Sequence, residues 1–204
     1  MLNILVIGTG MYSTGRGTDA YGTVLPAINE WHRNNSDSSK VVFVGTNGSH
    51  SNASRSKAEQ LARETGVNLD ISFLPGSDVI NKDAYKQALK EIPRPACAIV
   101  VVPDHLHFQI VHDCLMNDLP VLVVKPLTPT VKEAKKLIDL AKEGGADAAK
   151  FQSYKADTLA SKNSPSYWDT TKEPTESQHE LFQKYDQFEP DDYVVLSQYC
   201  KTNK

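Results

Sequence analysis

The stretch Ile4-Leu5-Val6-Ile7-Gly8-Thr9-Gly10, near the start of the chain, decides the fold class. Four consecutive aliphatic residues are typical of a parallel strand that is buried on both faces of a sheet. Glycines close this run, and apolar residues at helical spacing follow from Val24 to Trp31. A strand, a glycine-rich loop and a helix in this order are the setting in which a glycine motif binds the diphosphate of a dinucleotide.

The loop after this strand departs from the simple pattern G-x-G-x-x-G. A third glycine is expected at position 13, where Ser13 stands instead, and the next glycine comes two residues later. We interpret Met11 to Asp19 as an insertion. Backbone amides, hydroxyls and a guanidinium are suited to a phosphate, and a glycine-rich surface turn without a ligand is the alternative. The candidate cofactor contacts in this loop are Gly8, Thr9, Gly10, Met11, Tyr12, Gly15 and Arg16.

Strand-like and helix-like segments alternate from the start of the chain to about residue 143. Apolar runs predict strands at about 41–45, 69–74, 97–102 and 121–124, and helical patterns predict helices at about 54–65, 83–90, 108–115 and 131–143. Such alternation favours a parallel sheet with helical crossovers. The expected fold is therefore a Rossmann-like, doubly wound α/β sheet, followed by a partial, mostly helical α/β tail.

The second predicted strand ends where a nucleotide-binding fold places the adenosine ribose. Sites that prefer NAD usually carry an acidic residue there, and no carboxylate stands between residues 46 and 55. Hydroxyl, imidazole and guanidinium groups in this stretch are suited to a 2′-phosphate, which favours NADP over NAD. A cap for the next helix, supplied by one of the residues 51–54, is the alternative. The candidate contacts are Thr46, Asn47 and Arg55.

Composition and charge exclude several classes of protein. The net charge of the 204 residues is −3, and no basic patch with interleaved aromatic residues is present, so we expect no nucleic-acid partner. No apolar run reaches the ~20 residues of a membrane span, and the start lacks the basic residues of a signal peptide. Cys97, Cys114 and Cys200 show no metal-ligand spacing, so reduced thiols and no bound metal are expected. A cytoplasmic protein is the prediction.

Three segments carry a resemblance to a known family. They are Ile7-Gly8-Thr9-Gly10, Val101-Val102-Pro103-Asp104-His105-Leu106-His107, and Val121-Leu122-Val123-Val124-Lys125-Pro126-Leu127. Through them, residues 1–143 resemble the nucleotide-binding domain of the Gfo/Idh/MocA oxidoreductase family, which has a glutamate where this chain has Val124. The resemblance implies that Lys125 is the catalytic residue, which binds or polarises the substrate near the nicotinamide. A lysine that points to solvent is the alternative.

The same resemblance implies that Pro103, His105 and His107 border the nicotinamide ribose. For His105, a cap on the following helix is an equal alternative. Nothing after residue 143 resembles the substrate domain of that family.

A second resemblance is carried by segments that include Lys150-Phe151-Gln152, Ser166-Tyr167-Trp168-Asp169-Thr170 and Glu173-Pro174-Thr175. Through them, residues 131–204 resemble the N-terminal part of sialic acid (N-acetylneuraminate) synthase. The resemblance implies that Lys150 contacts phosphoenolpyruvate at a strand end of a (β/α)8 barrel, of which only about two of eight units are represented. His179 is expected to lie alone at the surface.

Both resemblances include the helix at about 131–143. The expected organisation is a Rossmann domain at 1–130, a shared joining helix at 131–145 and a synthase-like segment at 146–204. It predicts an NAD(P)-binding oxidoreductase domain of sugar dehydrogenase or reductase type, linked to sialic-acid-like sugar metabolism and incomplete as a catalyst alone. Its expected ligands are NAD or NADP and a sugar or nucleotide sugar, and its expected partners are a second copy or a synthase. A non-catalytic nucleotide-binding or regulatory module, and a truncated piece of a bifunctional oxidoreductase/synthase, are the alternatives.

Overall fold

The structure is a computed structural model that describes residues 2–35, 39–77, 79–124, 128, 130–146, 148–151, 154–166, 168, 170–171, 173–186 and 188–203. The chain divides into two compact units, Met1–Val124 and Lys125–Lys204.

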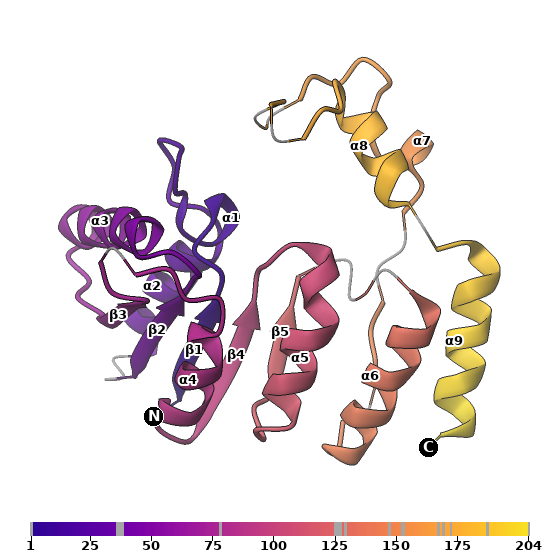
Figure 1. The fold of residues 1–204 in the computed structure, drawn as a ribbon, viewed down its shortest axis with the longest axis horizontal. Helices are drawn as coiled ribbons and strands as arrows, with labels where there is room; N and C mark the ends of the chain where they lie inside the picture. The colour runs from indigo at the N-terminus through magenta and orange to yellow at the C-terminus, as the bar shows by residue number, and fades with distance from the viewer. Residues whose placement is uncertain are drawn as a thin grey trace. The chain divides into compact units, whose positions relative to one another are not determined.

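The first unit is built on a parallel sheet of five strands. They lie in the order β3-β2-β1-β4-β5, and every neighbouring pair is parallel (Figure 1). All residues of β1 are buried, as expected for a central strand that is covered on both faces. The predicted Rossmann-like α/β sheet is confirmed. The strands are β1 (Asn3–Ile7), β2 (Lys40–Val44), β3 (Asp70–Leu74), β4 (Ala96–Val100) and β5 (Val121–Val123).

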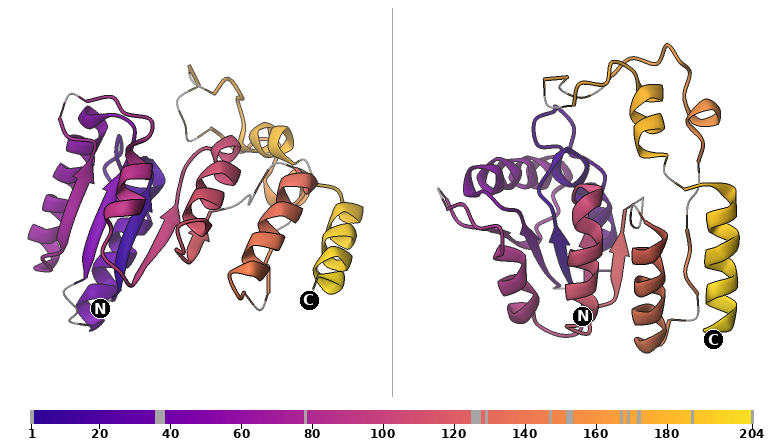
Figure 2. Two further views of the ribbon diagram at one scale, coloured as in Figure 1. Left: turned by 60° about the horizontal axis from the view of Figure 1, so that its bottom comes forward. Right: turned by 45° about the vertical axis from the view of Figure 1, so that its right-hand side comes forward.

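Helices connect the strands and cover the sheet. Alternate residues of β1 and β2 form one core with α2 and α3. The residues between them point to the opposite face, where α4 and α5 lie (Figure 2). The helices are α1 (Met11–Thr14), α2 (Val24–Asn35), α3 (Gly48–Thr65), α4 (Ala84–Glu91) and α5 (His107–Leu115), the last preceded by a 3-10 turn at Asp104–Leu106.

Two helix starts differ from the prediction. The helix expected from residue 54 begins at Gly48, because the side-chain oxygen of Asn47 accepts the amide N–H of Ser49 at 2.9 Å and caps the helix there. Residues 51–54 are therefore inside the helix and do not cap it. Residues 11–14, expected within an insertion, form the short helix α1. The irregular loop is thus confined to residues 15–23.

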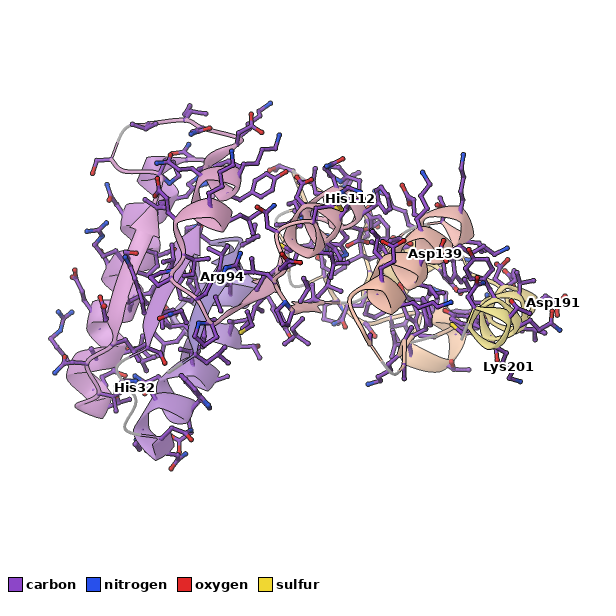
Figure 3. The ribbon with its side chains drawn as sticks, turned by 90° about the horizontal axis from the view of Figure 1, so that it is seen from below. His32, Arg94, His112, Asp139, Asp191 and Lys201 are labelled. Carbon is purple, nitrogen blue, oxygen red and sulfur yellow. The ribbon has the colours of Figure 1, made fainter. Side chains whose placement is uncertain are left out.

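The second unit is helical wherever it is regular, which agrees with the predicted tail. Its helices are α6 (Val131–Glu143), α7 (Ala156–Leu159), α8 (Gln178–Tyr185) and α9 (Pro190–Thr202). Thr130 caps α6, because its side-chain oxygen accepts the amide N–H of Glu133. Helices α6 and α9 pack through a small core, and the Tyr199 hydroxyl lies 2.8 Å from both carboxylate oxygens of Asp139, which Figure 3 labels on α6. Among the described residues of this unit, strand-type pairing is limited to an isolated bridge between Pro165 and Ser177.

The expectation for His179 is wrong. The residue is only 7% exposed, and its Nε2 lies 2.8 Å from the Asp157 carboxylate of α7. This contact lowers the pKa of Asp157. Helix α8 begins after Ser177, which forms a capping box with Glu180, so the helix start and the position of His179 are set together.

The three thiols are expected to react in an order set by burial. Cys114, on α5, is fully buried, and burial raises the pKa of its thiol to about 12. Cys97 and Cys200 are both partly buried, and burial raises the pKa of the Cys97 thiol. Because the thiolate is the nucleophile, iodoacetamide at mildly alkaline pH is expected to modify Cys200 first and Cys114 only in unfolded protein. Mass spectrometry of timed samples measures the order, and early modification of Cys114 in folded protein would contradict the packing of α5.

Candidate functional site

The order of the strands reverses between β1 and β4. From β1 the chain runs outward through β2 and β3, returns through α4, and continues from β4 to β5 on the other side. The loops that leave the carboxyl ends of β1 and β4 therefore diverge, and ligands of open α/β sheets bind in the crevice at such a point. The loops after β1, β2 and β4 carry most of the predicted site residues.

Gly8 fixes the path of the chain as it leaves β1. Its φ is +120°, and a Cβ atom at this position would lie 1.9 Å from the carbonyl oxygen of Val101, which follows β4. The Gly8 amide donates to the Val44 carbonyl at 2.8 Å, and the Val101 amide donates to the Ile7 carbonyl at 2.8 Å. Only glycine fits here, so the loop after β1 is held against both neighbouring strands.

Gly10 has a different reason to be glycine. Its φ of −87° and ψ of −172° are open to any residue, and a Cβ atom would meet nothing within 4 Å. Neither the backbone conformation nor packing in the described part of the chain requires glycine. The absence of a side chain at this position leaves room for another group to approach the backbone.

Two buried hydroxyl groups form hydrogen bonds with the glycine carbonyls of this turn. Ser13, which stands where the third glycine is expected, donates to the Gly8 carbonyl at 2.9 Å and lies 3.2 Å from the Gly10 carbonyl. The Thr14 hydroxyl lies 3.2 Å from the same Gly10 oxygen. Both side chains are fully buried. The serine that departs from the motif is thus accommodated through hydrogen bonds to the turn itself.

The carbonyl of Thr9, in the middle of the turn, accepts two further bonds. Arg16 donates from Nε at 2.8 Å, and Ser54 of α3 donates from its hydroxyl at 3.1 Å. Sequence reasoning did not identify Ser54, since nothing in its neighbourhood indicates a contact with a residue 45 positions away. By contrast, the amide N–H groups of Gly10, Met11 and Tyr12 donate to no acceptor among the described residues.

The loop after β2 lies against this turn. A Cβ atom on Gly45 would come within 2.5 Å of the Thr9 hydroxyl oxygen, so the two loops are in contact. Thr46 is exposed, and the side chain of Asn47 is used as the cap of α3. Arg55 lies farther along α3, with its guanidinium carbon 6.0 Å from the centre of the Phe73 ring.

The loop after β4 brings its predicted residues to the other side of the crevice. Pro103 and His105 are exposed, and the cap of α5 involves no side chain, so His105 does not cap this helix. His107 is fully buried, and its Nε2 lies 2.8 Å from the Val102 carbonyl. Its visible role is to support the loop from inside.

The remaining predicted residues lie elsewhere. Lys125 falls outside the described residues. Lys150 is exposed in an irregular segment of the second unit. In the part of the chain that the structure describes, no group of three or more His, Cys, Asp or Glu side chains is arranged to hold a metal ion. None of the described helices combines the length and the apolar character that a membrane span needs.

Comparison with protein families assigns two regions of the chain. Residues 2–149 match the oxidoreductase family with an NAD-binding Rossmann fold (GFO_IDH_MocA), and residues 137–204 match the NeuB family. The predicted two-part resemblance is confirmed, and the two matches overlap at residues 137–149. No curated protein matches the chain.

Solved structures similar to this chain include several oxidoreductases. One is a probable oxidoreductase, yhhX (26% identity, TM-score 0.48, covering 72% of this chain and 34% of that one). A second is UDP-N-acetylglucosamine 3-dehydrogenase GnnA from Acidithiobacillus ferrooxidans (20%, 0.43, 71% and 35%). A third is biliverdin reductase from Synechocystis in complex with biliverdin and NADP+ (19%, 0.46, 71% and 36%). The chain spans about a third of the length of each of these structures.

Proposed function

The chain belongs to the oxidoreductase family with an NAD-binding Rossmann fold, and on this premise we propose that its first unit binds NAD(P) in the crevice between β1 and β4. The observation that carries the proposal is Gly10, whose missing side chain serves neither the fold nor the packing of the described chain. Together with the unpaired amides of Gly10, Met11 and Tyr12, it offers open backbone donors to a diphosphate. The residues present therefore fit the cofactor, which supplies hydride transfer when bound.

In this proposal, each of three loops contacts a different part of the cofactor. The turn at residues 8–12, closed by the loop that contains Gly15 and Arg16, takes the diphosphate. Thr46 and Asn47 lie beside the adenosine ribose, with Arg55 as the predicted cation for a 2′-phosphate. Pro103 and His105 border the nicotinamide ribose, and His107 holds their loop in place. Lys125, two residues beyond β5, is the lysine proposed to polarise a substrate hydroxyl or carbonyl.

The proposed substrate is a sugar or nucleotide sugar. Support comes from the match of residues 137–204 to the NeuB family, which suggests a link to sialic-acid-like sugars. A non-catalytic nucleotide-binding module is the second candidate, because the described part of the second unit forms no sheet around a substrate pocket. Absorbance of reduced nicotinamide during incubation with nucleotide sugars separates the two, since only an enzyme changes it.

NADPH is expected to bind about tenfold more tightly than NADH, which corresponds to about 1.4 kcal/mol. The reason is the missing carboxylate at the end of β2, where Thr46 is exposed and cannot repel a 2′-phosphate. Titration of nicotinamide fluorescence measures both dissociation constants. A Thr46→Asp variant is the control, because its carboxylate repels the phosphate and is expected to reverse the preference. Equal affinities in the wild-type protein would contradict the NADP assignment alone, whereas binding of neither nucleotide would contradict the proposed function.

A further inference from the structure

Two side chains from separate elements converge on the carbonyl oxygen of Thr9. Arg16 Nε lies 2.8 Å from it and comes from the loop between α1 and α2. The Ser54 hydroxyl lies 3.1 Å from the same oxygen and comes from α3. A carbonyl oxygen offers two lone pairs, so both acceptor positions of Thr9 are used. Ser54 is fully buried and is itself 3.0 Å from the Thr14 hydroxyl, which leaves it little freedom to turn away.

These two bonds set the orientation of a whole peptide group. The peptide between Thr9 and Gly10 is planar, and in a trans peptide the N–H points opposite to the C=O. Because Arg16 and Ser54 hold the carbonyl from the protein side, the Gly10 N–H is directed away from them. That N–H donates to no described residue, and the Cβ position of Gly10 is open.

We infer that Arg16 and Ser54 are positioning residues, which aim the Gly10 N–H at a bound diphosphate by holding the Thr9 carbonyl. The inference rests on the proposed function and changes the role expected of Arg16 from a direct phosphate contact to an indirect one. Such preorganisation favours binding because the turn does not have to be reoriented when the ligand arrives.

The loop that carries Arg16 also makes hydrogen bonds of its own. Gly15 has a φ of +71°, and a Cβ atom there would lie 1.9 Å from the Ala20 carbonyl oxygen. The Thr18 hydroxyl donates to the Gly15 carbonyl at 2.9 Å and accepts the Ala20 amide at 3.2 Å. Thr18 therefore bonds within the loop and does not contact the Thr9 carbonyl, which makes it a control for loop order.

A direct contact and a positioning role predict different salt dependence. An ion pair between guanidinium and phosphate is screened by salt, so deleting it makes affinity less sensitive to ionic strength. Deleting a hydrogen bond within the turn lowers affinity at every salt concentration alike. Ser54 is neutral, so a loss of affinity in its variant cannot come from a missing ion pair.

The test measures the dissociation constant of NADPH at low and high KCl. Arg16→Ala and Ser54→Ala are each expected to weaken binding about tenfold, and Ser54→Ala, which removes no charge, is expected to keep the salt dependence of the wild-type protein. The double variant is expected to lose much less than the product of the two effects, because both side chains act on one carbonyl. Arg16→Gln keeps an N–H donor without the charge and is expected to recover most of the affinity, while Thr18→Ala stays within about twofold of wild type.

Three outcomes overturn the inference while the proposed function stands. They are unchanged affinity in Arg16→Ala, a loss in Arg16→Ala that disappears at high salt, and a loss in Thr18→Ala as large as that in Arg16→Ala. Wild-type protein that binds no nicotinamide dinucleotide overturns the proposed function and this inference with it. Thermal unfolding of each variant confirms that the compared proteins are folded, and the comparison of Arg16→Ala with Arg16→Gln carries the test if Ser54→Ala is unstable.

Discussion

Replacement of Gly8 by alanine is expected to unfold the first unit under conditions in which the wild-type protein is folded. The new Cβ atom would lie 1.9 Å from the carbonyl oxygen of Val101 and 2.8 Å from its carbon, in a residue whose φ of +120° is already strained for any L-amino acid. The obstructing atoms are backbone, and the Val101 amide is bonded to Ile7, so neither strand yields alone. We expect a cost of about 3–5 kcal/mol, a large share of the ~5–15 kcal/mol that stabilises a typical domain.

Urea and thermal unfolding followed by circular dichroism measure this effect, with a fall in midpoint of about 10 °C or more expected. Gly17→Ala is the matched control. Gly17 also has a positive φ, +84°, but a Cβ atom there would meet nothing within 4 Å. Its variant is expected to lose only about 1 kcal/mol of stability, because alanine is strained at this positive φ. A Gly8→Ala protein as stable as Gly17→Ala would contradict the close approach of Gly8 to the Val101 carbonyl described above.

Replacement of Gly10 by alanine is expected to weaken the binding of NADPH by a factor of about ten or more. In contrast to Gly8→Ala, it is expected to leave the stability of the protein unchanged. The residue adopts a backbone conformation open to alanine, and the added methyl group contacts no protein atom. In the proposed complex the same methyl group would occupy the space through which the diphosphate approaches the turn. The clash is therefore felt only when the ligand binds.

Isothermal titration of NADPH together with thermal unfolding of the same samples checks both parts of this expectation. Serine at position 10 extends the series, since its larger side chain is expected to weaken binding further. An alanine variant that binds as the wild-type protein does would remove the observation on which the proposed function depends. A variant that unfolds early would show that Gly10 serves the fold.

The sheet could be predicted from the sequence because its central strands, β1 and β2, are buried on both faces. Such strands need aliphatic residues at every position, as in Ile4–Ile7, and the pattern is therefore visible without any partner. The start of α3 was misplaced because Gly48 and the serines that follow are poor helix formers, and the cap at Asn47 outweighs them once its side chain accepts the Ser49 amide.

The turn of the candidate site could be predicted from the sequence, and the contacts that support the turn could not. Glycines indicate a turn, so the sequence predicts the turn at residues 8–10. The donors that hold the turn's carbonyls are less visible, because a serine on α3 gives no local sign that it bonds to Thr9. The same limit applies to His179, whose pairing with Asp157 depends on how α7 and α8 meet. Contacts between distant segments depend on tertiary packing, which cannot be inferred from local sequence patterns.

The close approach of Gly45 to Thr9 has a consequence for any redesign of cofactor choice. In the proposed complex, the loop after β2 lies beside the adenosine ribose and would discriminate NADP from NAD. This loop is in contact with the turn at residues 8–12, which would bind the diphosphate that both cofactors share. A substitution next to Gly45 that shifts the backbone also shifts Thr9, so a change in selectivity is accompanied by a change in overall affinity. In the proposed complex, a variant that moves this backbone is therefore expected to change selectivity and affinity together.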